Sequence, residues 1–129
     1  MKRSLAGMAI LASLLAAGPA AAQASLTVDF SWSGIAACGT KPPAFKIGGI
    51  PAATKKLRFA MKDLDKPGFD HGGGTIDYAG GAEIAAGAFF YTGPCPPGGT
   101  HRYQWTVQAL DAAGRVIAAG QATKPFPPR

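Results

Sequence analysis

Two polar stretches of the sequence carry the side chains best suited to chemistry. The first runs from Asp63 to Gly74 and holds three aspartates and His71 within nine positions. Alternate side chains of an extended backbone point the same way, so Asp63 and Asp65 would face one side. The glycines after His71 suit a flexible loop or the close approach of a ligand. A solvated acidic turn is the alternative interpretation of this stretch.

The second stretch runs from Tyr91 to Arg102 and contains three prolines, which restrict its backbone. Tyr91 begins it, and His101 and Arg102 end it where a strand is expected. A rigid loop flanked by these side chains indicates a cradle for an anion. The alternative is a proline-rich connection that only sets the geometry of the neighbouring strands.

Both stretches offer groups that recognise anionic oxygens. A tyrosine hydroxyl and neutral imidazoles can donate hydrogen bonds to such oxygens, and a protonated histidine would bind them more strongly. A carboxylate beside them would repel an anion unless it orients a histidine, and we expect Asp63 to have that role. Anion binding therefore needs the histidines, with Asp63 as a positioning group.

An enzyme is the less favoured interpretation of the same residues. The histidines and carboxylates could form an acid–base set or a metal site. No serine lies in a nucleophile-elbow motif, and the spacing of His71 and His101 matches no metal-binding signature. We expect no enzymatic activity, no cofactor and no metal.

The elements that must position these groups are strands. Alternation of apolar and polar residues predicts strands over 26–32, 57–62 and 101–110. A weaker strand is expected over 115–121, after a turn at 111–114, with short ones over 45–47 and 75–78. Only 81–88 has a composition that suits a helix, and its glycines argue against a long one. The predicted class is mostly β: one β-sandwich-like domain with short or no helices, packed around Trp32, Phe59, Tyr103 and Trp105.

The N-terminus has the three parts of a secretory signal peptide. Lys2 and Arg3 precede an uncharged apolar run from Leu5 to Ala17, and small residues follow. Cleavage fits after Ala22 or after Ala24, so we divide the chain into a signal peptide over 1–24 and one β domain over 25–129. A membrane anchor is the alternative, but the run is shorter than the roughly 20 residues that span a bilayer. The sequence predicts a periplasmic or secreted protein without a transmembrane segment in the mature chain.

Export changes what the charges and cysteines imply. Loss of Lys2 and Arg3 lowers the formal net charge from +6 to about +4, and the remaining basic residues are scattered, so we expect no nucleic acid partner. The two cysteines, Cys38 and Cys95, favour a disulfide in an oxidising compartment over two unpaired buried thiols. Such a bridge would stabilise the fold by about 3–4 kcal/mol.

Several motifs occur together in one order. They are Cys38-Gly-x-x-Pro42-Pro43, Gly49-x-Pro51-Ala-x-Thr54-Lys55, Asp63-x-Asp65-x-Pro67, Tyr91-x-Gly93-Pro94-Cys95-Pro96-Pro97, Gly99-x-His101-Arg102-Tyr103 and Ala109-Leu110-Asp111. Over residues 38–111 the chain resembles the bacterial phosphatidylethanolamine-binding protein family, also called Raf-kinase-inhibitor-like proteins. The resemblance implies a β-sandwich-like fold with a small pocket for phosphate, acetate or a phospholipid head group.

The resemblance also implies which residues form the pocket. The ligand-binding set would be Asp63, Asp65, His71, Tyr91, Gly93, Pro94 and His101, with Pro42 and Pro43 on the rim. The chain departs from the family pattern at Leu64, where the family has a proline, and at Gly72–Gly74, where the family usually has a tryptophan and valines. These departures predict a pocket that is shallower or no longer functional. The expected partner is a small anion such as phosphate or a phospholipid head group. A periplasmic protein partner, as in protease inhibition, is the alternative, and a hydrolase or metal-site enzyme is the least favoured.

Overall fold

A computed structural model describes residues 10, 13 and 23–128 of the chain, and these contain eight strands and no helix. The strands are β1 (Ala24–Ser25), β2 (Thr27–Ser31), β3 (Ala44–Gly48), β4 (Lys56–Asp63), β5 (Asp70–Asp77), β6 (Glu83–Ile84), β7 (His101–Leu110) and β8 (Val116–Phe126). No helix in the described part is long and apolar enough to cross a membrane. The predicted signal peptide lies outside the described residues, apart from Ile10, Ser13, Gln23 and Ala24.

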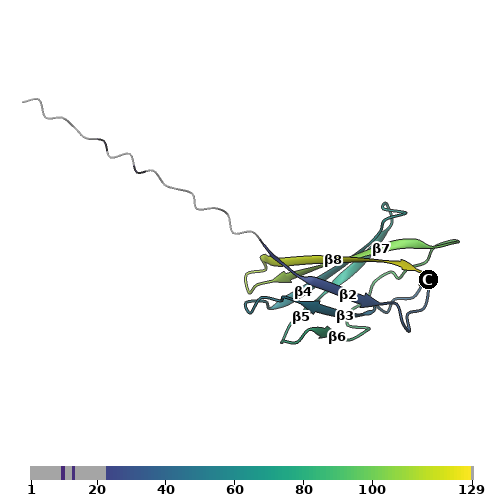
Figure 1. Ribbon diagram of the computed structural model, residues 1–129, viewed down its shortest axis with the longest axis horizontal. Helices are drawn as coiled ribbons and strands as arrows, with labels where there is room; N and C mark the ends of the chain where they lie inside the picture. The colour runs from purple at the N-terminus through teal and green to yellow at the C-terminus, as the bar shows by residue number, and fades with distance from the viewer. Residues whose placement is uncertain (1–9, 11–12, 14–22, 129) are drawn as a thin grey trace, which may run out of the picture.

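The strands form two sheets that pack face to face (Figure 1). The large sheet has the order β1-β8-β7-β4-β5, and the small sheet has the order β2-β3-β6. All neighbours are antiparallel except β1, which pairs with β8 in parallel. The chain passes from the large sheet to the small one at Leu26, between β1 and β2. The result is a β-sandwich, as the sequence predicted.

Alternation along β4 and β7 creates the core between the sheets. In β4 every second side chain is buried, among them Leu57, Phe59 and Met61. In β7 Tyr103, Trp105 and Val107 are buried on the same face of the sheet. Trp32 and Phe45 meet them from the loop after β2 and from β3, with the Trp105 and Phe45 rings edge to face and 5.1 Å apart. The four predicted core aromatics are all buried.

Strand β5 is glycine-rich because it lies unusually close to its neighbours. A Cβ atom at Gly73 would lie 1.8 Å from the carbonyl oxygen of Phe59 on β4, and one at Gly74 would lie 2.6 Å from the Cβ of Phe89. Real Cβ atoms do not approach backbone atoms so closely, so Gly73 has no alternative that keeps this packing. The predicted strand over 75–78 is therefore the end of a longer strand that contains the glycines.

The other predicted strands are confirmed to within one residue at each end, except that the strand predicted over 115–121 extends further. Strand β7 has the predicted bounds, and the turn at 111–114 is closed by the amide of Gly114 donating to the carbonyl of Asp111 over 2.9 Å. The segment 115–121 continues through Pro125 to Phe126 as one strand of 11 residues. The composition over 81–88 gives the short strand β6 and no helix. The first residues of the proline-rich tail therefore belong to the large sheet.

Candidate functional site

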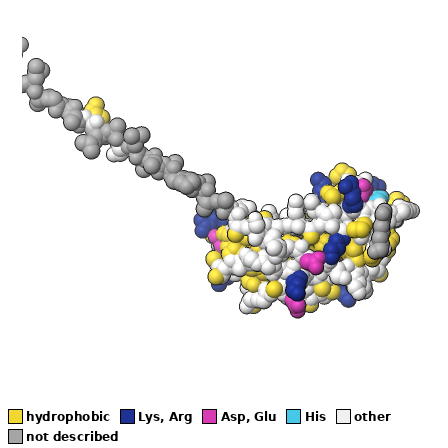
Figure 2. Space-filling model, viewed as in Figure 1, with side chains coloured by type: hydrophobic (Ala, Val, Ile, Leu, Met, Phe, Trp, Pro, Cys, Tyr) yellow, Lys and Arg dark blue, Asp and Glu magenta, His cyan; other side chains and the backbone are white. Residues whose placement is uncertain are grey.

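A hollow of about 290 Å³ lies at the end of the sandwich where β4 ends and β5 and β7 begin. Figure 2 shows a histidine side chain beside acidic and basic side chains at the end of the molecule where the β4–β5 loop protrudes in Figure 1. The hollow is lined by Cys38, Asp63, Lys66, Phe69, His71, Thr92, Gly93, Cys95, Pro97, His101 and Tyr103. Both polar stretches of the sequence therefore contribute to one site.

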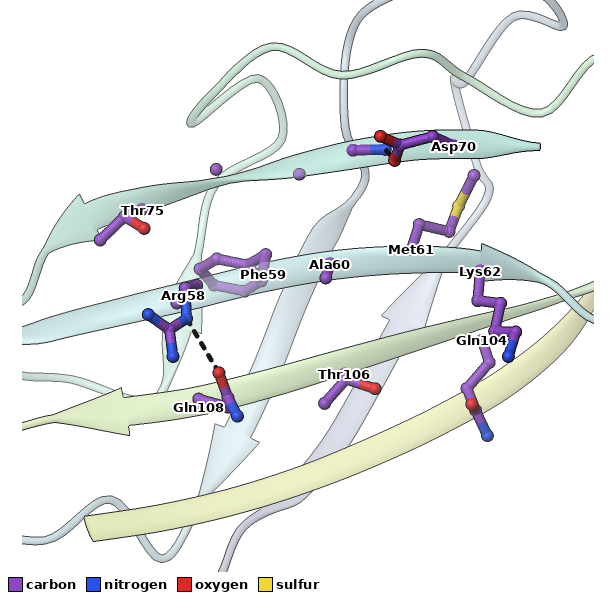
Figure 3. A pocket seen from close by; sticks show the side chains of 13 residues that line it. Arg58, Phe59, Ala60, Met61, Lys62, Asp70, Thr75, Gln104, Thr106 and Gln108 are labelled. Carbon is purple, nitrogen blue, oxygen red and sulfur yellow. Dashed lines mark hydrogen bonds between the residues drawn. The ribbon is translucent and has the colours of Figure 1, made fainter. Parts of the chain in front are cut away.

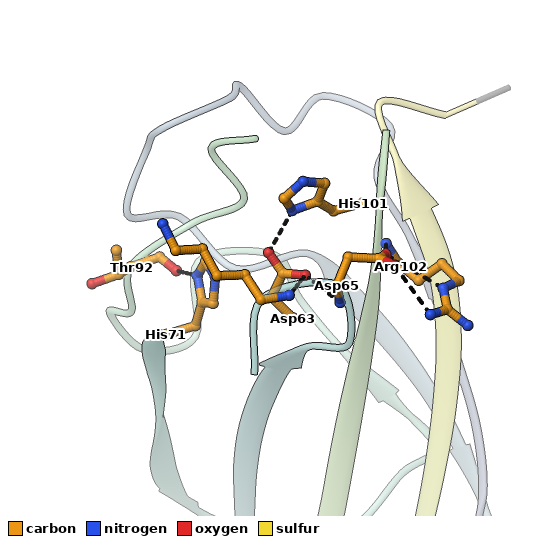
Figure 4. A network of polar contacts seen from close by, with 7 residues as sticks. Asp63, Asp65, His71, Thr92, His101 and Arg102 are labelled. Carbon is orange, nitrogen blue, oxygen red and sulfur yellow. Dashed lines mark hydrogen bonds and ion pairs between the residues drawn. The ribbon is translucent and has the colours of Figure 1, made fainter. Parts of the chain in front are cut away.

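Asp63 is the centre of a hydrogen-bonded network at the base of this hollow (Figure 4). It is buried at the end of β4, and its Oδ1 accepts from the amides of Asp65 and Lys66 over 2.9 and 3.0 Å. Its Oδ2 lies 2.7 Å from Nδ1 of His101. Burial alone would raise the pKa of Asp63, but the hydrogen bonds from His101 and the two amides outweigh burial and lower the pKa below its ordinary value. Asp63 is thus an ionised carboxylate that orients a histidine, as the sequence predicted.

His71 is held in a comparable way from the opposite wall. Its Nδ1 lies 2.6 Å from the carbonyl oxygen of Thr92, and its buried ring contacts the rings of Phe69 and Tyr103 at 4.6 and 5.5 Å. The amide of Thr92 donates in turn to the carbonyl of His71 over 3.0 Å. A carbonyl oxygen can only accept, so the Nδ1 of His71 carries the proton. The loop after β6 therefore fixes both the tautomer and the orientation of this imidazole.

The state of the two rings corrects one expectation from the sequence. In each histidine the Nδ1 proton is already donated, to Thr92 or to Asp63, which leaves Nε2 as the free ring nitrogen. The Nε2 of a neutral imidazole with a protonated Nδ1 is an acceptor. Neutral imidazoles cannot therefore donate to an anion here, contrary to the expectation, and each ring becomes a donor to a ligand only when it is protonated.

The disulfide between Cys38 and Cys95 forms another wall of the hollow. It joins the loop after β2 to the proline-rich loop, and the described residues contain no free cysteine. The amide of Cys38 donates to the carbonyl of Pro94, and the amide of Gly93 donates to the carbonyl of Gly39, each over 2.8 Å. A Cβ atom at Gly93 would lie 2.5 Å from the oxygen of Gly39, so this close pairing of the loops requires glycine. The predicted disulfide is present.

Asp63, His71, Gly93 and His101 of the predicted ligand-binding set line the hollow, and the others lie elsewhere. Asp65 binds Arg102 instead, through the backbone amide at 2.6 Å and through Nη2 at 3.1 Å, and these hydrogen bonds lower the pKa of Asp65. Pro42, Pro43 and Pro94 are completely buried. The structure thus places Asp65 in a clamp between the β4–β5 loop and β7, and Pro42 and Pro43 do not form the predicted rim, because they are buried.

Tyr91 also lies outside the hollow, because its side chain points into the core. Its ring packs against Trp105 at 5.1 Å and Phe89 at 6.4 Å, and its buried hydroxyl has no hydrogen-bond partner among the described residues. Burial raises the pKa of Tyr91 well above its ordinary value. Phe90, the residue before it, is 83% exposed instead. Alternation through 89–91 therefore turns Tyr91 inward and Phe90 outward.

Besides the two cysteines, which were predicted as a disulfide, the ligand-binding set predicted from the sequence lacked five residues of the hollow: Lys66, Phe69, Thr92, Pro97 and Tyr103. Tyr103 was assigned to the core by alternation along β7, and its ring is indeed buried while it also faces the hollow. Burial, and next the nearby Asp63 carboxylate, raise the pKa of Tyr103 to about 12. Lys66 could have been found from its place in the motif that begins at Asp63. Its exposed ammonium group adds a positive charge to the hollow that also contains both histidines.

The side chains around the hollow determine which kind of ligand they could contact. Within the described residues, no three histidine, cysteine, aspartate or glutamate side chains gather in a way that could hold a metal ion. Lys66 and two histidines that can be protonated surround a small hollow, and Asp63 and the Thr92 carbonyl hold the histidines in place. Such groups match an oxyanion with several acceptor oxygens.

Comparisons with known proteins identify the type of fold. No family model matches the chain, and the search of curated proteins found no match. Among solved structures, the chain is similar to the crystal structure of a protein from Chlamydia trachomatis described as a phosphatidylethanolamine-binding protein homolog. The two share 19% sequence identity with a TM-score of 0.58, over 84% of this chain and 100% of the other. The chain therefore has a fold of the phosphatidylethanolamine-binding protein type.

Proposed function

We propose that this protein is a non-enzymatic binding protein whose hollow takes the phosphate group of a small anion or of a phospholipid head group. The observation that carries the proposal is the convergence of Lys66, His71 and His101 on one hollow, with both Nδ1 atoms already engaged. Binding rather than catalysis is favoured because both cysteines are bridged and no thiolate is available as a nucleophile. The fold adds support, since the similar Chlamydia protein is described as a homolog of lipid-binding proteins.

The engaged Nδ1 atoms predict that phosphate binds together with protons. A neutral ring offers phosphate only the acceptor Nε2, so favourable contacts require the imidazolium form. We expect the affinity for phosphate to rise as the pH is lowered, with proton uptake on binding. Calorimetry in buffers of different ionisation enthalpy measures that uptake directly. A pH-independent affinity without proton uptake would contradict this arrangement.

Substitutions at the site test the proposal by residue. We expect His101→Ala and Lys66→Gln each to weaken phosphate binding by roughly tenfold, because each removes a charge-assisted hydrogen bond. Asp63→Asn should also weaken it, since the carboxylate both orients the His101 ring and stabilises its charged form. Asp77→Asn and Lys55→Gln are the matched controls, because both residues are exposed and lie outside the hollow. If His101→Ala and Asp63→Asn both leave the affinity unchanged in calorimetry, the proposal fails.

We also propose that the protein is exported, with cleavage after Ala22. The disulfide is consistent with an oxidising compartment. Of the two predicted cleavage positions, only the one after Ala22 keeps β1 whole: Ala24 pairs with Ala118, and the Gln23 side chain donates to the carbonyl of Val116 over 3.3 Å. Mass spectrometry of protein from the periplasm or culture medium should show a chain that begins at Gln23. A chain that still begins at Met1 would overturn the proposal of export.

A further inference from the structure

The outward face of the large sheet holds a second hollow, separate from the one at the strand ends. It has a volume of about 560 Å³ and lies across β4, β5 and β7 (Figure 3). Its lining residues are Arg58, Phe59, Ala60, Met61, Lys62, Asp70, Gly72, Gly73, Gly74, Thr75, Gln104, Thr106 and Gln108. The glycine run of β5, which the site with His71 does not explain, borders this surface. We call it the sheet groove.

The strand register gives the sheet groove a bare centre and a cation at each end. Ala60 pairs with Gly73 on one side and with Thr106 on the other, so only small side chains occupy the middle. Arg58 is two residues away in one direction and Lys62 two residues away in the other, and both are exposed. Figure 3 shows these two side chains at opposite ends of the groove. At about 3.3 Å per residue, the two positions are roughly 13 Å apart.

The positive charges of the sheet groove are not neutralised by carboxylates within the described part of the chain. Arg58 donates from Nε to Oε1 of Gln108 over 2.9 Å, which leaves both terminal guanidinium nitrogens for a ligand. Neither Arg58 nor Lys62 occurs in the ion pairs of the described residues, whereas Lys56 and Arg102 pair with Asp77 and Asp65.

A single carboxylate, Asp70, lies in the lining of the sheet groove, as the cross-strand partner of Lys62, and its Oδ1 accepts from the amide of Gly72 over 2.8 Å. With two cations against one carboxylate, the lining keeps an excess of positive charge that complements an anionic ligand.

The rest of the lining selects the kind of anion. Amides of Gln104 and Gln108 and hydroxyls of Thr75 and Thr106 offer both donors and acceptors, which suit a ligand rich in hydroxyl groups. The one aromatic residue of the lining, Phe59, is 1% exposed with its ring in the core, so no aromatic face is available for stacking. Single-stranded nucleic acids depend on such stacking, which makes them a poor match.

We propose that the sheet groove binds an acidic polysaccharide, with carboxylates of one extended glycan chain contacting Arg58 and Lys62 and its hydroxyl groups contacting the amides and hydroxyls between them. The spacing of the two cations requires an extended polymer rather than a single small anion.

Titration of the purified protein with an oligogalacturonate long enough to span both cations tests the proposal, and fully methyl-esterified oligogalacturonate is the neutral control. We expect binding of the acid form only, weakened by added salt. The double variant R58Q/K62Q should lose roughly tenfold or more in affinity. Ala60→Phe should also weaken binding, because it fills the bare centre without a change of charge.

Two control variants separate this site from other causes. K46Q/K55Q removes two exposed lysines elsewhere and makes the same change in net charge, so it should bind the oligogalacturonate as well as the unchanged protein does. His101→Ala should also bind it normally, because His101 lies in the other hollow. Absence of binding, equal losses in R58Q/K62Q and K46Q/K55Q, or tighter binding of single-stranded DNA than of the oligogalacturonate would each overturn the proposal.

Discussion

Replacing Cys38 and Cys95 together with alanine is expected to lower the free energy of unfolding by about 4 kcal/mol. The bridge joins residues that are 57 apart in sequence, and a loop of that length restricts the unfolded chain strongly. The sandwich is small, since its strands all lie within residues 24–126, and a total stability of about 5–15 kcal/mol is ordinary for such a domain. The loss would therefore remove a large share of what keeps the domain folded.

Urea denaturation of the double variant, followed by circular dichroism, measures this loss. The unchanged protein, denatured with and without a reductant, is the matched control: its reduced form should unfold at the same midpoint as the double variant. A difference below about 1 kcal/mol between the oxidised protein and the variant would contradict the expectation, because the paired loops would then be held together by other contacts. The contacts that would then hold the loops together are two backbone hydrogen bonds, one between Gly93 and Gly39 and one between Cys38 and Pro94.

The sequence predicted the strands wherever side chains alternate, and it was incomplete wherever the backbone alone decides. The alternation over 101–110 gave β7 its full length. Strand β5 was predicted only in part, because glycines have no side chains to show a period. What makes 72–74 a strand is close backbone packing, with Gly73 against the carbonyl of Phe59. The full length of β8 was not predicted, because a proline such as Pro125 normally argues against a strand. The proline fits here because β1 pairs only with residues 118–119, so the end of β8 that contains Pro125 is an edge of the sheet.

The candidate site was predictable in its chemistry and less so in its geometry. The expected contact between Asp63 and a histidine is present, because the Asp63-x-Asp65 motif turns back over its own carboxylate while His101 begins the neighbouring strand. Tyr91 was expected at the anion and lies in the core. Alternation through 89–91 could have shown this, since Phe89 and Tyr91 fall on one side and Phe90 on the other. The hydrogen bond of His71 Nδ1 could not be predicted from side-chain types, because its acceptor is the backbone carbonyl of Thr92.

Trp105→Ala is expected to lower the free energy of unfolding by about 3–5 kcal/mol, an effect as large as loss of the disulfide. Trp105 is completely buried in the middle of β7. Its ring contacts Phe45 of the small sheet at 5.1 Å, and it contacts Tyr91 and Phe89 of the loop after β6 at 5.1 and 5.8 Å. One side chain thus joins the two sheets and the segment that carries Thr92. Its removal leaves a cavity that three other elements would have to fill.

Two further variants of β7 decide whether this loss comes from packing. Thr106→Ala changes the next residue, which faces the opposite side of the sheet, and should stay within about 0.5 kcal/mol of the unchanged protein. Trp105→Phe keeps an aromatic ring and removes a buried indole N–H that has no hydrogen-bond partner in the described part of the chain, so its cost should be clearly smaller than that of Trp105→Ala. Denaturant unfolding measures all three. Equal losses for Trp105→Ala and Thr106→Ala would show that the two faces of β7 contribute alike, which would contradict the alternation on which the whole fold depends.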